Sequence, residues 1–217
     1  MIKKMKVDRV KQNNITHPGF RGIKSAQIRP IKDIAGDVFI YSLEPEKDEN
    51  FCGKLLKKLI KSQNGRMNTE NASIFQFMKN AFATIQYADS AYLAVHNQKP
   101  FGFMSTLTAP FKEVHLAYLA TWKTPELEKV KNGGSMFMNH LLRQNRGMNK
   151  ITLTPSYNSD TFYYKFGFDY DDEYALSTMF LDGRNIDKQL TKFSKTFDYK
   201  EIKNSPSVNL SDVIECE

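Results

Sequence analysis

A basic, glycine-containing stretch runs directly into an amphipathic helical pattern beyond the middle of the chain. It reads KVKNGGSMFMNHLL, so that Lys129 and Lys131 precede Asn132 and the adjacent glycines Gly133 and Gly134. Adjacent glycines let backbone N–H groups approach an anion, and a helix N-terminus adds unpaired N–H groups and partial positive charge. Binding of an anion is the chemistry that suits such a loop, and a plain surface turn is the alternative.

A phenol and two proton acceptors are the other candidates for chemistry. Tyr163 lies four residues before Gly167 in FYYKFGF, and its hydroxyl can donate a proton or a hydrogen bond. Glu113 and His115 share one face of a predicted strand with Ala117, because side chains alternate along a strand. Both can accept a proton, and histidine titrates near neutral pH. The structural alternatives are an aromatic packing cluster and a solvated strand face.

The remaining histidines and the cysteines show no metal-binding spacing. His17, His96 and His140 are isolated, and His140 is expected on a helix surface. Cys52 lies on an apolar helical stripe, and Cys216 has no basic neighbour that would activate its thiol. No metal site and no nucleophilic cysteine are predicted, and two distant cysteines favour a reducing compartment.

The composition fits one folded domain with extensions. The chain has 217 residues, of which 41% are hydrophobic and 25% charged, which is sufficient for a packed core. Its net charge of +7 favours anionic partners such as a phosphorylated cofactor, nucleic acid or a membrane surface. No stretch approaches the ~18 apolar residues of a membrane span, and no helix-turn-helix, zinc or aromatic-basic signature supports nucleic-acid binding. A protein without a membrane span is therefore predicted, and nucleic acid is not an expected partner.

The elements that must position these residues alternate between strand and helix patterns. Period-two and β-branched stretches predict strands over 25–32, 37–43, 113–122, 150–155 and 172–181, and a pair of strands within 90–107. Period-3.6 stripes predict helices over 51–59, 74–85, 133–146, 158–166 and 186–197. This order predicts a mixed α/β domain.

Three pieces of the chain resemble the GCN5-related N-acetyltransferases, the GNAT family. HLAYLATWKTPE followed by KVKNGGSMFMNHLL resembles the family's fourth strand, pyrophosphate loop and following helix. KITLTPS resembles the fifth strand, and FYYKFGF resembles the family's Tyr-x-x-x-Gly-Phe ending. The likeness covers roughly residues 38 to 181. The family pattern of the loop is Gln/Arg-x-x-Gly-x-Gly/Ala, and here Asn132 replaces the first glycine. Asparagine tolerates left-handed backbone angles, so the loop can still form.

The resemblance implies a GNAT fold with a mixed central sheet of about six to seven strands, flanked by helices, and a C-terminal helical extension. The expected organisation is a basic arm or covering segment over 1–24, an acetyltransferase domain over 25–182, and a C-terminal helix with a polar tail over 183–217.

The resemblance also implies a cofactor and a set of sites. Acetyl-CoA is the expected co-substrate, with no metal. The residues expected to bind it are Leu119, Thr121, Lys129, Lys131, Asn132, Gly133, Gly134, Ser135 and Asn158. The implied general acid for the departing thiolate is Tyr163, with Tyr164 as its competitor. The register leaves the base open: His115 is better placed if Thr121 holds the acetyl group, and Glu113 if Leu119 does. A water chain is the third alternative.

The function expected from the resemblance is acetyl transfer from acetyl-CoA to a primary amine of a protein or a small molecule. A non-catalytic module that binds CoA or a protein partner on the same fold is the alternative. The expected location is the cytoplasm. The acidic C-terminal tail, dotted with apolar residues, would also suit a secretion signal of a bacterial effector that acts in a host cell.

Overall fold

The computed structural model describes residues 21–31, 37–43, 76, 79–80, 83–122, 130, 132–170, 177–212 and 214. The strands are β1 (Arg21–Pro30), β2 (Val38–Leu43), β3 (Ser90–His96), β4 (Lys99–Ala109), β5 (Glu113–Thr121), β6 (Lys150–Leu153), β7 (Asp169–Tyr170), β8 (Met179–Asp182), β9 (Phe197–Glu201) and β10 (Ser207–Asn209). The helices are α3 (Gly133–Gln144), α4 (Asp160–Tyr164) and α5 (Ile186–Phe193), with short 3-10 turns η1 (Thr84–Tyr87), η2 (Pro110–Lys112), η3 (Gly183–Asn185) and η4 (Leu210–Asp212). The helix predicted over 51–59 lies outside the described residues, and the one over 74–85 is described only in part.

The described strands form one mixed sheet. Their order is β10-β1-β2-β3-β4-β5-β6-β8-β7, and β9 also pairs with β1. All described neighbours are antiparallel except β5 and β6, which run parallel. The predicted α/β class with a mixed central sheet flanked by helices is confirmed.

The predicted count of six to seven strands is wrong, because the described residues already form a sheet of ten strands. Two of the additional strands, β9 and β10, lie in the segment expected as a helix and polar tail. Both pair with β1, so their pairing depends on a partner distant in sequence. β7 adds a two-residue strand beside β8.

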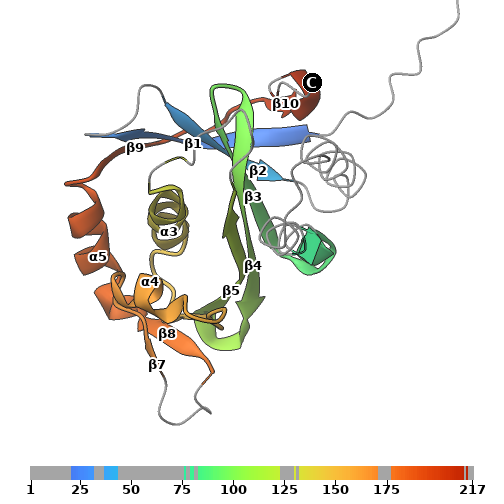
Figure 1. Ribbon diagram of the computed structural model, residues 1–217. Helices are drawn as coiled ribbons and strands as arrows, with labels where there is room; N and C mark the ends of the chain where they lie inside the picture. Colours follow the sequence, from blue (N-terminus) through green and yellow to red (C-terminus); the bar gives the residue numbers. More distant parts are fainter. Residues whose placement is uncertain are drawn as a thin grey trace, which may run out of the picture.

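Two apolar clusters lie on the two faces of the sheet. Figure 1 shows α3 and α5 on one side of the curved sheet and η1 on the other. The first cluster joins α3 and α5 to alternate residues of the strands, including Ile151 and Leu153 of β6 and Leu116 of β5. The second contains Ile85 of η1 with Ala120 and Trp122. The sheet is therefore a layer buried from both sides, and each side chain of β5 belongs to one face or the other.

Residues with positive φ angles mark the turns between several elements. The β3–β4 hairpin turns at Asn97 and Gln98, which have φ angles of 47° and 63°. The loops after α3 and α4 contain Gly147 and Gly167 at φ angles of 87° and 81°, values that glycine adopts without strain.

The C-terminal extension is tied to α3 by a buried polar contact. The Tyr199 hydroxyl of β9 lies 2.9 Å from Nδ1 of His140 in α3, and the Arg143 guanidinium lies 4.3 Å from the centre of the Tyr199 ring. His140 has no exposed surface. The prediction that His140 lies on the helix surface is therefore wrong, because β9 and neighbouring strands cover that face of α3. Within the described residues, no helix is long and apolar enough to cross a membrane.

Candidate active site

A bulge in β5 separates two parts of that strand. Tyr118 pairs with Ser105 and Leu116 pairs with Thr106, so Ala117 has no partner in β4. β6 pairs with β5 only up to Leu116. Beyond the bulge β5 continues to Thr121, while β6 ends and its chain turns toward α4. The two parallel strands therefore separate, and a gap opens beside the second half of β5.

Backbone N–H groups of β5 face this gap. Trp122 donates its N–H to the carbonyl of Phe101 in β4 at 2.9 Å. Backbone directions alternate along an antiparallel strand, so Ala120 also faces β4, while Leu119 and Thr121 face the opposite side. Among the described strands none pairs with Leu119 or Thr121 on that side. Their N–H groups therefore face the gap and are available to a hydrogen-bond acceptor placed there.

The N-terminus of α3 opens onto the same gap. Asn132 precedes the helix with φ 60° and ψ 20°, which is the left-handed conformation that asparagine tolerates. Gly133 donates its N–H to the carbonyl of Val130 at 3.2 Å, and Met136 donates to Asn132 at 3.0 Å. The first turn of α3 contains no acidic residue. Its unpaired N–H groups and partial positive charge are thus not neutralised by the helix itself.

Packing explains both glycines of the loop. A Cβ at Gly133 would lie 3.0 Å from the Phe101 ring, and a Cβ at Gly134 would lie 2.9 Å from the Phe162 ring. The glycines therefore let the start of α3 approach both the sheet and α4. This requirement comes from tertiary contacts, in addition to the anion approach that the sequence suggests.

Tyr163 closes the side of the gap opposite β5. It lies on α4, is 9% exposed, and packs edge-on against Phe162 and Phe168 at ring distances of 5.0 and 6.1 Å. Burial raises the pKa of Tyr163 to about 12, so the phenol stays protonated at neutral pH. Tyr164, its competitor, is 44% exposed and contacts Tyr170 instead.

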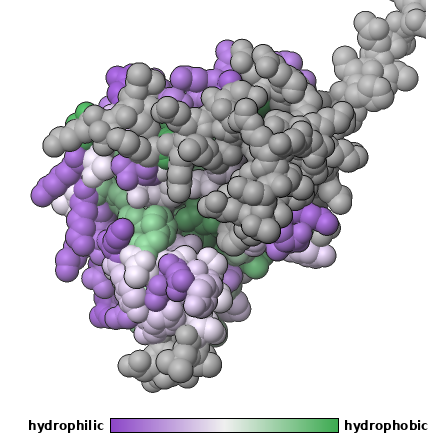
Figure 2. Space-filling model, viewed as in Figure 1, coloured by the Kyte–Doolittle hydropathy of each residue, from purple (hydrophilic) through white to green (hydrophobic). Residues whose placement is uncertain are grey.

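These parts enclose a cleft of about 720 Å³. Figure 2 shows hydrophobic atoms at the bottom of a recess on the face that carries α3 and α4. The lining residues come from the end of β5, the start of α3 and the segment from β6 into α4: Leu119, Ala120, Thr121, Val130, Asn132, Gly133, Gly134, Ser135, Ser156, Ser159, Phe162, Tyr163 and Lys165. The cleft thus combines an apolar wall, outward-facing N–H groups, a helix N-terminus and one phenol.

The two candidate bases lie on the other face of the sheet. Leu116 points toward α3, so His115 points away from it, and Nδ1 of His115 lies 3.0 Å from Oγ1 of Thr152. Burial lowers the pKa of His115, so the imidazole is neutral at pH 7. Glu113 is two residues earlier on the same face. The predicted face of Glu113, His115 and Ala117 is interrupted at Ala117, because the bulge changes the alternation.

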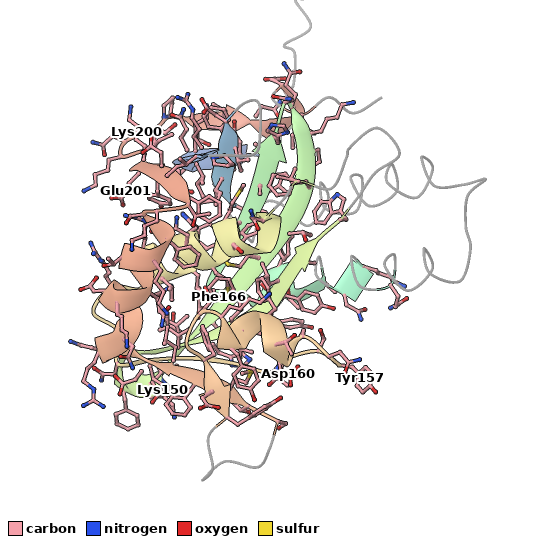
Figure 3. All side chains as sticks on the ribbon, turned by 60° about the vertical axis from the view of Figure 1, so that its left-hand side comes forward. Lys150, Tyr157, Asp160, Phe166, Lys200 and Glu201 are labelled. Carbon is pink, nitrogen blue, oxygen red and sulfur yellow. The ribbon has the colours of Figure 1, made fainter. Side chains whose placement is uncertain are left out.

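Two of the predicted residues, Lys129 and Lys131, lie outside the described residues, and a third, Asn158, does not line the cleft. Asn158 is exposed, has a φ angle of 61° and is not among the lining residues. Its neighbour Tyr157 is 95% exposed and projects away from the protein (Figure 3).

Several lining residues were not predicted from sequence. Ser156 and Ser159 form a small polar turn, in which the Ser159 hydroxyl donates to the Ser156 carbonyl at 2.7 Å. Phe162 and Lys165 flank Tyr163 in FYYKFGF, and Lys165 places a cation at the mouth of the cleft. The spacing of three residues that joins Ser159, Phe162 and Lys165 was the available signal, because residues at this spacing share one face of a helix. No group of three or more His, Cys, Asp or Glu side chains within the described residues could hold a metal ion.

Comparison with known proteins gives matches among solved structures. No family model matches the chain, and no curated protein matches it. A structure described as AtaTR bound with acetyl-CoA is 13% identical, covers 76% of this chain and 97% of that chain, and has a TM-score of 0.46. A GNAT family acetyltransferase from Brucella melitensis in complex with acetyl-CoA is 15% identical over 67% of this chain and 87% of that chain, with a TM-score of 0.41. An acetyltransferase of the GNAT family from Staphylococcus aureus Mu50 is 12% identical, covers 67% of this chain and 99% of that chain, and has a TM-score of 0.46. Likeness at these values assigns no activity, so the residues of the cleft must carry the functional argument.

Proposed function

We propose that the protein is an acetyl-CoA-dependent N-acetyltransferase that acetylates a primary amine. The observation that carries the proposal is the meeting of three features in one cleft. These are the outward-facing N–H groups at the end of β5, the N-terminus of α3 and the phenol of Tyr163. The N–H groups suit a thioester carbonyl, the helix N-terminus suits a pyrophosphate, and the phenol suits a departing thiolate.

The pyrophosphate is assigned to the start of α3. Unpaired N–H groups around Gly134 and Ser135 can donate to its oxygens, and the helix dipole favours its charge. Lys165 adds a cation at the mouth of the cleft. Lys129 and Lys131 remain predicted contributors from the preceding loop.

The acetyl group is assigned to the gap beside β5. An N–H of Leu119 or Thr121 donates to the thioester oxygen, where negative charge grows as the amine attacks. The amine nitrogen bonds to the carbonyl carbon, the carbon–sulfur bond then breaks, and the electron pair of that bond stays on sulfur. Tyr163 donates a hydrogen bond to this sulfur. The amine proton leaves to a base or to water.

The acceptor amine is assigned to the face of the sheet that carries His115. The cleft opens where β5 and β6 separate, and His115 lies on β5 just before this point. A neutral imidazole at pH 7 can accept the amine proton, directly or through water, and Glu113 is the alternative acceptor. The acceptor is a protein amine or a small-molecule amine.

Ser135→Glu tests the proposal with little risk to the fold. Gly134 is a poor probe, because a Cβ there would meet Phe162. A carboxylate at Ser135 repels a pyrophosphate, yet an acidic side chain in the first turn stabilises a helix. Acetyl-CoA should therefore raise the Tm of the wild type and of the neutral control Ser135→Gln, but not that of Ser135→Glu. Ligand-free Ser135→Glu should melt no lower than the wild type.

The expected Tm increase follows from mass action. Acetyl-CoA at 100 times its Kd should stabilise the folded state by about 2.7 kcal/mol. An equal increase in Ser135→Glu would move the pyrophosphate away from α3. No increase in any of the three proteins would contradict the proposed cofactor.

A CoA-binding module without catalysis is the second candidate. The observation that favours it is the high pKa of Tyr163, about 12, which makes the phenol a weak acid. This candidate predicts calorimetric binding of acetyl-CoA without transfer of a labelled acetyl group to any amine in a mixed panel. Transfer to a single amine would exclude it.

A further inference from the structure

A second cavity adjoins the acyl-CoA cleft at the start of α3. It measures about 260 Å³ and shares Asn132, Ser135 and Lys165 with the cleft. Its far wall is α5, which belongs to the C-terminal extension and to no part of the family motifs quoted above. The start of α3 therefore separates two neighbouring cavities.

The second cavity has an aromatic wall and a basic rim. Phe166 and Phe193 stack at 5.3 Å with an angle of 17° between their rings, and Figure 3 shows Phe166 among α3, α4 and α5. Lys165 and Lys192 are the charged residues that line the cavity, and both are exposed. Neither lysine forms an ion pair with another described residue. The cavity thus suits a ring with a negatively charged substituent.

The shape of CoA matches two cavities joined at one helix N-terminus. Its pyrophosphate lies in the middle of the molecule, with the thioester arm on one side and an adenosine 3′-phosphate on the other. A pyrophosphate at α3 would leave the thioester arm for the cleft and the adenosine arm for the second cavity. The second cavity, at about 260 Å³, is slightly smaller than a pocket that holds a whole small molecule, so its size suits one arm of a larger ligand.

We infer that α5 completes the CoA site by holding the adenosine 3′-phosphate. The adenine lies against Phe166 and Phe193, and the ammonium group of Lys192 contacts the 3′-phosphate. This inference rests on the proposed function. It gives the C-terminal extension a role in ligand binding, and it makes the 3′-phosphate a determinant of affinity.

Dephospho-CoA, which lacks only the 3′-phosphate, tests the inference in calorimetric titrations of the full chain. The wild type should bind CoA about twofold to fivefold more tightly than dephospho-CoA, as expected for an exposed charge pair. Lys192→Met keeps the apolar stem and removes the charge, so the ratio of the two affinities should fall to about one. Lys188→Met is the matched control, because Lys188 is exposed on the same helix and does not line the cavity.

The possible results separate the two claims. Equal affinities for CoA and dephospho-CoA in the wild type, or the same ratio in both lysine variants, would overturn the role of α5 and leave the proposed function intact. Failure of the wild type to bind either ligand would contradict the proposed function, and the inference with it.

Discussion

Tyr163→Phe separates two roles that the phenol can have in thiolate departure. Burial raises the pKa of Tyr163 to about 12, whereas an alkyl thiol has a pKa of about 8.5. Complete proton transfer from the phenol to the thiolate would be uphill by about 3.5 pKa units, or about 5 kcal/mol. We therefore expect Tyr163 to donate a hydrogen bond to the sulfur, with the proton remaining mainly on the phenol.

The expected size of the effect follows from this role. A hydrogen bond to a charged group contributes about 1.5–3 kcal/mol, so its loss should lower kcat by roughly 10- to 150-fold. The bond forms only as charge develops on sulfur, so acetyl-CoA affinity should hardly change. The fold should persist, because phenylalanine keeps the ring contacts of Tyr163 with Phe162 and Phe168.

Three quantities measured on the same variant decide the outcome. They are kcat from release of the CoA thiol, Kd for acetyl-CoA from calorimetry, and Tm. Tyr164→Phe is the matched control, because Tyr164 is the exposed neighbour in the same helix, and it should leave all three unchanged. A loss in kcat above about 1,000-fold would refute the hydrogen-bond role and indicate full general-acid catalysis. An unchanged kcat would show that the thiolate leaves without Tyr163.

Two further predictions concern groups that titrate. Burial lowers the pKa of His140 to about 3, so the unfolded chain takes up a proton below pH 6.5 that the folded chain refuses. The contribution of His140 to the free energy of unfolding is therefore fully present above pH 6.5 and is lost as the pH falls toward 3. The loss should be about 2 kcal/mol at pH 5. Urea unfolding should show this loss in the wild type but not in His140→Gln. A wild-type stability that does not change between pH 7.5 and 5 would contradict the burial of His140. The second prediction is that Glu113→Gln and His115→Ala differ in their pH–rate profiles, because only one of these two side chains accepts the amine proton and so sets the pH dependence of the rate. If both variants keep the wild-type profile, water accepts the amine proton.

Local sequence features predicted the elements that carry the cleft. The helix that begins beside Gly134 and the strand that begins at Glu113 follow from periodicity, which acts within a few residues of chain. The position of Tyr163 before Gly167 likewise placed it on the short helix beside the cleft.

Features that depend on distant partners were not predicted. Ala117 gives no local sign of a bulge, since alanine fits a regular strand equally well, yet the bulge decides which side chains of β5 face the cleft. The polar strands β9 and β10 exist because β1 offers a free edge. The C-terminal extension also buries His140, through Tyr199 of β9, and its helix α5 lines the second cavity with Lys192 and Phe193.

A crystal structure with bound acetyl-CoA tests the central claim most directly. We predict pyrophosphate oxygens within hydrogen-bond distance of the backbone N–H groups of Gly134 and Ser135, and the thioester oxygen within about 3 Å of the N–H of Leu119 or Thr121. The sulfur should lie beside the hydroxyl of Tyr163. A pyrophosphate bound away from α3, or a thioester outside the gap between β5 and β6, would contradict the account.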